Sequence, residues 1–222
     1  MKKNLRIQRK EKRRQENRQY ILEAAEEIFA AKGFAHSSVD DIADKSQFSK
    51  ATIYRYFESK LDIFSAVILN SFREAHDEIE KIRDKPAGSE SKLKDMISFI
   101  LRYYQRKQNI TRIFFMEQEV MKKILGMDMK THIMPYEAKK QIPENFRKIV
   151  HSMFQSTCAI IQEGVSSGEF RELEAEEAAS IFGAMLRGFH FKGPTLEKTY
   201  SVEESADLLL DYFLNGIRRK EE

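Results

Sequence analysis

Hydrogen-bond donors are concentrated in one short stretch of the chain, between residues 49 and 60. Within about three helical turns this stretch carries hydroxyl, phenol and ammonium groups on Ser49, Lys50, Thr52, Tyr54, Tyr56 and Lys60. Such groups donate to phosphate oxygens and to the edges of bases, which are the contacts that proteins make with DNA. Neither a metal-ligand spacing nor an enzyme motif accompanies them, so the stretch indicates binding rather than catalysis.

A short helix is predicted just before this stretch, beginning after residue 38. Ser38 is followed three residues later by Asp41, and a hydroxyl with a carboxylate one turn on marks a helix start. Val39, Ile42 and Ala43 give this helix an apolar side. The apolar pattern breaks a few residues later, which predicts a tight turn.

Ser49 is expected to cap a second helix. In this helix Ile53 and Phe57 lie one turn apart and face the core, so Ala51 and Arg55 point away from it. Two short helices, a tight turn and donors on the outer face describe a helix-turn-helix whose second helix enters the major groove of DNA. The alternative is a plain packing unit, as most amphipathic helix pairs are.

The distribution of charge favours the DNA-binding interpretation. Residues 1–60 carry 14 Lys/Arg and nine Asp/Glu, a net charge of +5, whereas the rest of the chain has a net charge of −2. Positive charge gathered around the donors is what counterion release from a polyanion requires. The basic residues 1–14 are interpreted either as a solvated tail or as an arm that follows the DNA backbone or enters the minor groove.

The run from Tyr20 to Phe64 resembles the DNA-binding region of the tetracycline-repressor (TetR) family. The matching pieces, in order, are ILEAA, IF, KGF, SVDDIA, SKATIYRYFESK and a trailing IF. Each piece is weak alone, whereas their order and spacing are specific. The resemblance covers about a fifth of the chain and implies that the second helix of the motif reads an operator.

The resemblance also implies roles for individual residues, position by position. Lys50 and Ala51 would face bases, and Tyr54 would face bases or phosphate. The predicted DNA-binding set is completed by Ser49 and by residues expected mainly to grip phosphates: Ser38, Thr52, Tyr56 and Lys60. The sequence departs from the family pattern at Gln47, where a turn glycine is usual, and at Ala51, often glycine or proline. A non-glycine residue in a left-handed turn costs roughly 1 kcal/mol.

Helix is favoured throughout the chain, because Gly (9) and Pro (4) are scarce among 222 residues while Met (9) and Phe (16) are plentiful. The predicted fold class is all-α: an N-terminal three-helix helix-turn-helix domain followed by a C-terminal helical ligand-binding and dimerisation domain. Residues 1–14 are expected to be a basic flexible arm, 15–60 the DNA-binding domain, and 61–222 the effector-binding and dimerisation domain. The first helix is predicted from about Gln15 to Lys32, with Gly33 just past its end.

Aromatic and methionine side chains follow the apolar sides of the C-terminal helices. The resemblance implies a cavity in this half, and the candidate effector-binding residues are Phe99, Tyr103, Phe114, Met121, Phe154, Met185 and Phe189. The alternative for each is a core position, since Met and aromatic stripes usually pack. This composition favours an apolar or aromatic effector.

The last two helices are expected to form a dimer. Two such helices from each subunit would make a four-helix bundle around a two-fold axis, with Ile181, Met185, Leu209 and Phe213 at the interface. A homodimer also fits the DNA-binding end, because a two-fold dimer reads half-sites about one helical turn apart. Disruption of Leu209 or Phe213 is therefore expected to yield monomers with weak operator binding.

These patterns predict a ligand-responsive transcriptional regulator, a repressor that binds a pseudo-palindromic double-stranded operator as a homodimer and is released by a small effector. The helix that begins near Ser59 would transmit effector binding to the recognition helices. The alternative is a helical scaffold with a degenerate motif. A single cysteine, Cys158, and the lack of an apolar run of about eighteen residues favour a cytoplasmic protein without a membrane partner. No cofactor, metal ligand or catalytic residue is predicted.

Overall fold

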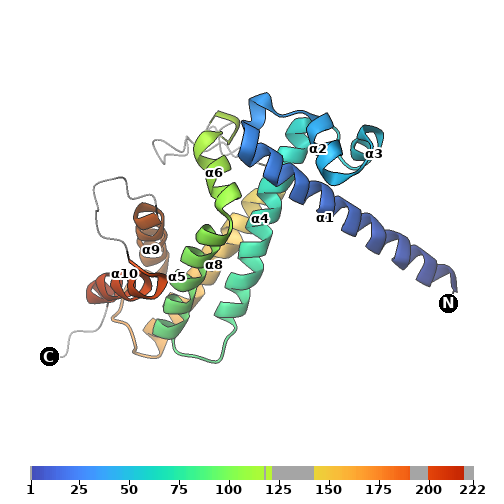
Figure 1. Cartoon of the computed structure of the whole chain (residues 1–222). Helices are drawn as coiled ribbons and strands as arrows, with labels where there is room; N and C mark the ends of the chain where they lie inside the picture. Colours follow the sequence, from blue (N-terminus) through green and yellow to red (C-terminus); the bar gives the residue numbers. More distant parts are fainter. Residues whose placement is uncertain (1, 118, 122–142, 191–199, 218–222) are drawn as a thin grey trace. The chain divides into compact units, whose positions relative to one another are not determined.

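The protein is all-α, as its sequence predicts (Figure 1). The computed structural model describes residues 2–117, 119–121, 143–190 and 200–217. Within these ranges the side chains of residues 2–5, 114–116, 190, 216 and 217 are not described. No helix in the described part of the chain has an apolar stretch long enough to cross a lipid bilayer.

Short connections join the helices from α1 to α6. In chain order they are α1 (Lys2–His36), α2 (Val39–Ser46), α3 (Lys50–Tyr54), α4 (Lys60–Arg83), α5 (Ser89–Arg106), α6 (Gln108–Met116), α8 (Glu144–Ser166), α9 (Ala175–His190) and α10 (Val202–Ile217). The predicted helix-turn-helix is formed by α2 and α3.

Helix α1 begins at Lys2, well before the predicted start near Gln15. Residues 2–14 contain eight Lys/Arg and neither Gly nor Pro, so their helix propensity is high, although the described side chains of residues 6–14 are all exposed. The apolar period marks only the part of α1 that is buried. At Gly33 the backbone leaves the helical conformation, with φ 76° and ψ 166°, which agrees with the predicted helix end.

Packing divides the chain into two units, and each is described by itself. The first comprises residues 1–71 and 107–143, so it contains the helix-turn-helix, the beginning of α4 and α6. Its core includes three aromatic rings, since the Phe29 and Phe34 centroids lie 5.1 and 5.2 Å from that of Phe64. Ile110 and Ile113 of α6 are buried in the same unit. The predicted domain boundary at residue 60 stays a prediction.

The second unit comprises residues 72–106 and 144–222. Helix α5 packs against both α8 and α10 and is therefore central to this unit. Leu93 and Ile97 of α5 are fully buried, and so is Ile161 of α8. The edge of the Phe182 ring meets the Phe213 ring at a centroid distance of 5.1 Å, which joins α9 to α10.

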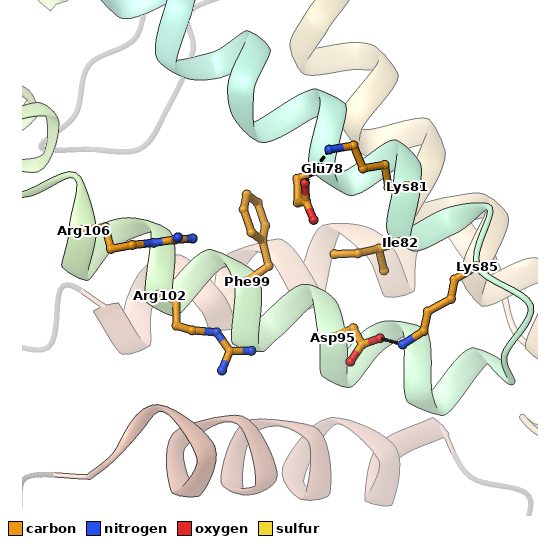
Figure 2. A pocket seen from close by; sticks show the side chains of 8 residues that line it. All are labelled: Glu78, Lys81, Ile82, Lys85, Asp95, Phe99, Arg102 and Arg106. Carbon is orange, nitrogen blue, oxygen red and sulfur yellow. Dashed lines mark hydrogen bonds and ion pairs between the residues drawn. The ribbon is translucent and has the colours of Figure 1, made fainter. Parts of the chain in front are cut away.

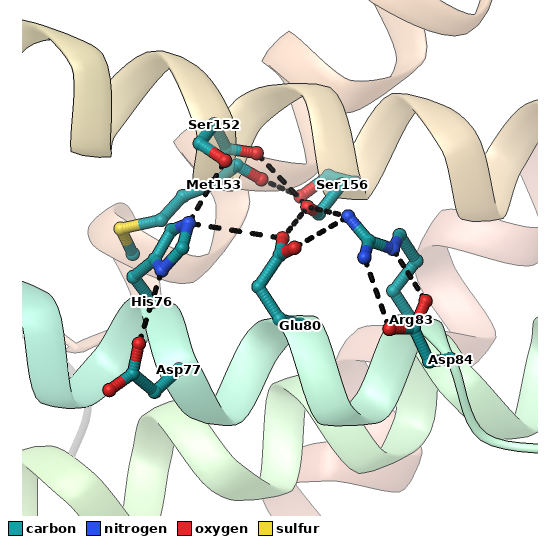
Figure 3. Close-up of polar contacts among 9 residues, drawn as sticks. His76, Asp77, Glu80, Arg83, Asp84, Ser152, Met153 and Ser156 are labelled. Atoms are coloured by element: carbon teal, nitrogen blue, oxygen red, sulfur yellow. Dashed lines mark hydrogen bonds and ion pairs between the residues drawn. The ribbon is translucent and has the colours of Figure 1, made fainter.

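A polar network fastens α4 to α8 within the second unit (Figure 3). His76 Nε2 lies 2.9 Å from Ser152 Oγ, and Arg83 Nη1 lies 2.7 Å from Glu80 Oε2. Ser156 Oγ donates to Glu80 Oε1 and accepts from Arg83 at 3.3 Å. Because the carboxylate is satisfied by both a cation and a hydroxyl, we interpret this network as a structural clamp rather than as a catalytic group.

Candidate nucleic-acid interface

The start of α2 is fixed by the capping box that the sequence predicts. Ser38 Oγ accepts a hydrogen bond from the Asp41 N–H at 3.1 Å, and Asp41 Oδ2 accepts one from the Ser38 N–H at 2.8 Å. Asp41 Oδ1 also lies 2.5 Å from Lys32 Nζ on α1. The Lys32 ammonium, together with the Ser38 donors, lowers the pKa of Asp41 to about 2. The carboxylate therefore stays charged and holds α2 against α1.

Gln47, directly after α2, takes the left-handed conformation although it is not glycine, with φ 58° and ψ 26°. The Gln47 N–H donates to the Asp44 carbonyl at 3.4 Å and the Phe48 N–H to the Ala43 carbonyl at 3.2 Å. This pair of bonds satisfies the last carbonyls of α2 in a Schellman arrangement. The turn is thus closed by backbone bonds even though no glycine stands in it.

The orientation predicted for α3 is confirmed. Ser49 caps the helix by accepting from the Thr52 N–H at 3.1 Å. Ile53 is fully buried and Phe57 nearly so. Burial of each side chain contributes about 1.5–3 kcal/mol to the stability of the folded unit. Ala51 is exposed, and Tyr54 exposes 49% of its surface. The apolar pair thereby turns the opposite side of α3 outward.

Two predicted donors are held by neighbouring side chains. Lys50 Nζ lies 2.8 Å from Asp40 Oδ2 at the surface, and the hydrogen bond to this carboxylate raises the Lys50 pKa. The Tyr56 hydroxyl accepts a hydrogen bond from Asn17 Nδ2 on α1 at 3.3 Å. The structure therefore places both groups on the same unit as α3 and restrains their orientation before any ligand is present.

Lys60 has an internal role in this structure. Its ammonium donates to the carbonyls of Phe34 and Ser37, at 2.6 and 2.7 Å, and lies 4.4 Å from the centre of the Phe34 ring. These bonds fasten the start of α4 to the connection between α1 and α2. Two of its three N–H donors are used in this way. The phosphate contact of Lys60 remains a prediction.

Two groups of this unit lie outside the predicted DNA-binding set. Glu117, at the end of α6, accepts a hydrogen bond from the Phe34 N–H at 2.6 Å, and Gly33 is buried beside it. No local sequence pattern predicts this contact. Arg55, which the sequence predicts to point away from the core, is exposed beside Tyr54 and is a further cation on the outer side of α3. Its four-residue spacing from Ala51 places it on that side.

The predicted effector-binding residues fall into both units. Phe99, Phe154, Met185 and Phe189 are partly buried against the core of the second unit, and Tyr103 lies 5.6 Å from the Phe99 ring. Met121, by contrast, is fully buried and belongs to the first unit. The side chain of Phe114 lies outside the described part. Their role as a ligand pocket remains a prediction.

The four predicted dimer residues differ in exposure. Leu209 and Phe213 are buried in the core of their own subunit, where Phe213 packs on Phe182. Ile181 exposes 57% of its surface and Met185 is half-buried, both on α9. A partner could therefore contact Ile181 directly, whereas Leu209 and Phe213 serve the subunit core.

The chain is similar to known regulators of transcription. Residues 21–67 match the family model described as bacterial regulatory proteins, tetR family. The HTH-type transcriptional repressor NicS of Pseudomonas putida is 28% identical over 211 residues, which cover 91% of this chain and 92% of NicS. The HTH-type transcriptional activator FasR of Mycolicibacterium smegmatis is 40% identical over 55 residues, 25% of each chain.

Solved structures share the fold over nearly the whole chain. A TetR/AcrR-family regulator from Thermobifida fusca superposes with a TM-score of 0.66 at 25% identity, covering 92% of this chain and all of the other. FadR of Bacillus subtilis, solved in complex with stearoyl-CoA, gives a TM-score of 0.67 at 20% identity over 90% of this chain and 99% of FadR. These proteins are regulators of transcription, and α2 with α3 is the candidate DNA-binding surface of this chain.

Proposed function

Because the chain belongs to the tetracycline-repressor (TetR) family of bacterial transcriptional regulators, we propose that it is a repressor that binds a pseudo-palindromic operator as a homodimer and is released by a small effector. The observation that carries the proposal is the outer side of α3. Lys50, Ala51 and Tyr54 lie there, on a helix fixed from behind by Ile53 and Phe57. We place this regulator in the cytoplasm, where its DNA is.

The outer side of α3 suits a major groove for a physical reason. A small residue at Ala51 lets the backbone approach the base edges, while Lys50 and Tyr54 flank it with donors. Arg55 adds a second cation on the same side. The carboxylate of Asp40 holds Lys50 in place only weakly, since water and salt screen exposed ion pairs, so the ammonium can leave it for DNA.

A matched pair of lysine variants tests the DNA-binding surface. Lys50 and Lys148 are both exposed and both lie beside a carboxylate, Asp40 at 2.8 Å and Glu144 at 2.7 Å. Lys50→Ala should weaken binding to the protein's own promoter DNA by roughly tenfold or more. It should also reduce the slope of log K against log salt by about 2, because each subunit of the dimer loses one cation from the DNA interface.

Fluorescence anisotropy with labelled promoter fragments at several salt concentrations measures both quantities. Lys148→Ala on α8 should leave affinity and salt slope unchanged. If Lys50→Ala binds like the wild type, or if both variants lose affinity equally, the assignment of α3 as the recognition helix is wrong.

We place the dimer interface on the exposed side of α9, around Ile181 and Met185, and not on the buried residues of α10. Ile181→Glu should give monomers in sedimentation-velocity runs and weaken operator binding. Val150→Glu on α8 is the control, because Val150 is also an exposed apolar residue. An Ile181→Glu protein that remains dimeric contradicts this placement.

The effector is proposed to be small and to carry an apolar or aromatic part. Support comes from the partly buried Phe99, Phe154, Met185 and Phe189 along the second unit. The stearoyl-CoA found in Bacillus subtilis FadR shows that one protein of this fold accepts a ligand with a long apolar chain. Effector binding would favour one arrangement of the C-terminal helices over another. The effector can shift the equilibrium between these two arrangements by no more than the difference between its binding free energies for them.

A further inference from the structure

A groove runs along the second half of α4 and the length of α5, with a volume of about 370 Å³ (Figure 2). All of its walls belong to the second unit. This volume is at the small end of the range for ligand sites, about 300–1,000 Å³, so the groove suits a small molecule or one part of a longer one. The residues that line it are Glu78, Lys81, Ile82, Lys85, Asp95, Phe99, Arg102 and Arg106.

The floor of the groove is apolar. Ile82 of α4 is 8% exposed, and Phe99 of α5 is half-buried with its ring 5.6 Å from that of Tyr103. In Figure 2 the Phe99 ring stands in the middle of the groove, between the arginines and Ile82. An apolar chain of a few carbons laid along this floor would be removed from water on one side.

The charges along the groove are not evenly balanced. At one end Lys85 Nζ lies 2.5 Å from Asp95 Oδ2, and on the α4 side Lys81 Nζ lies 2.9 Å from Glu78 Oε2, so these cations are neutralised locally. At the other end stands Arg106, for which the described residues offer no ion-pair or hydrogen-bond partner.

Arg102 lies one helical turn before Arg106 on α5, so both guanidinium groups serve the same end of the groove. Arg102 Nη1 is 3.1 Å from Glu203 Oε1 across a solvent-exposed contact, with half of the Arg102 side chain still accessible. In Figure 2 the Arg106 side chain extends towards Phe99. The groove therefore has a cationic end and an apolar middle.

We propose that this groove binds an amphipathic anion, with a phosphate or carboxylate head on Arg106 and Arg102 and an apolar tail on Phe99 and Ile82. Planar guanidinium groups bind both kinds of anion through paired N–H donors, which gives orientation as well as affinity. If the protein is a regulator as proposed above, on which this step rests, the effector is such an anion. The predicted apolar effector then gains a charged head.

Isothermal titration calorimetry on the full-length protein tests the site with eight-carbon probes. Octyl phosphate and octanoate carry the two heads, 1-octanol has only the tail, and inorganic phosphate has only the charge. At least one of the two anionic amphiphiles should bind ten or more times tighter than octanol and inorganic phosphate. The tighter of the two identifies the head as phosphate or as carboxylate.

Arg106→Glu should weaken binding of that amphiphile at least tenfold and leave octanol unaffected. Arg106 is exposed at the end of α5 and has no described partner, so the variant should keep its fold, which far-UV circular dichroism checks. Lys148→Glu, a charge reversal on α8, is the control and should bind like the wild type. Equal binding of octanol and the anions, or an Arg106→Glu protein that binds like the wild type, overturns the site.

The regulatory step has a separate readout. Added octyl phosphate or octanoate, whichever binds, should change the affinity for promoter DNA at least fivefold in the wild type and not in Arg106→Glu. Calorimetric binding without any change in DNA affinity overturns the effector role. A protein that binds no promoter DNA in the absence of ligand contradicts the proposed function instead, and the calorimetry of the groove is unaffected by that failure.

Discussion

The junction between Gly33 and Glu117 allows a prediction that separates two physical effects. A Cβ atom on residue 33 would stand 2.7 Å from Glu117 Oε1, the oxygen that accepts the Phe34 N–H at 2.6 Å. Gly33→Ala must therefore strain the backbone at φ 76° and ψ 166°, a region open essentially only to glycine, and also push the carboxylate away.

The expected magnitude follows from these two parts. The backbone part costs about 1–3 kcal/mol. Loss of the partly buried hydrogen bond between Phe34 and Glu117 adds about 1–2 kcal/mol. Gly33→Ala should thus cost about 3 kcal/mol, which corresponds to a melting temperature lower by roughly 6–12 °C in a chain of this size. Glu117→Ala alone should cost about 1–2 kcal/mol, because it removes only the hydrogen bond.

The double variant distinguishes displacement from simple addition. In Gly33→Ala the displaced carboxylate has already lost its hydrogen bond to the Phe34 N–H. The additional change Glu117→Ala therefore removes no further interaction, and the double variant should be about as stable as Gly33→Ala. Thermal unfolding by circular dichroism at one fixed protein concentration measures this, since dimer formation makes the melting temperature depend on concentration. If the stability lost in the double variant equals the sum of the losses in the two single variants to within about 0.5 kcal/mol, the reasoning is refuted.

A second glycine supplies the control for backbone strain. Gly168 has φ +78° and no atom within 4 Å of the place where a Cβ would stand. Gly168→Ala should therefore show the backbone cost with no steric part. Gly168→Ala thus reports the cost of a positive φ without a steric contact, whereas the ψ of 166° adds strain of its own at Gly33, so the double variant with Glu117→Ala is what isolates the contact.

Three further changes have predicted outcomes. Gly164→Ala in α8 should destabilise by about 1–3 kcal/mol in urea unfolding despite alanine's better helix propensity, because the new Cβ would clash with the buried Phe170 ring. Gln47→Gly should raise the stability by up to about 1 kcal/mol in the same assay, since glycine adopts the left-handed turn without strain. The pKa of Asp41 is lowered to about 2 by the Lys32 ammonium, below its ordinary value of 3.8, so its stabilisation is present above about pH 4 and lost as the pH falls towards 2. The difference in urea midpoint between wild type and Asp41→Asn should accordingly close over that pH range.

The helix-turn-helix could be predicted because its determinants are local. The capping box joins Ser38 to a residue three positions away, and the inward pair Ile53 and Phe57 are one turn apart. Even the left-handed backbone at Gln47 follows from its place directly after a helix end. Spacing of this kind is visible in any window of a few residues.

Contacts between distant residues could not be predicted in this way. Lys60 reaches a carbonyl 26 residues earlier, and Glu117 reaches an N–H 83 residues earlier. Lysine near a DNA-binding motif is more readily interpreted as a phosphate contact than as an internal clamp. The apolar period of α10 likewise shows that Leu209 and Phe213 are covered, without showing whether their own subunit or a partner covers them.

An ion pair at the candidate interface explains how its cation can be both ordered and available. Lys50 Nζ lies 2.8 Å from Asp40 Oδ2, and half of the lysine side chain stays exposed. Exposed ion pairs are weak because water and salt screen them, whereas counterions are released wherever a cation of the protein replaces them on DNA. Asp40 therefore restricts where the Lys50 ammonium points without preventing its transfer to DNA. The same reasoning sets Lys60 apart, because its bonds to two backbone carbonyls are partly buried and would cost more to break.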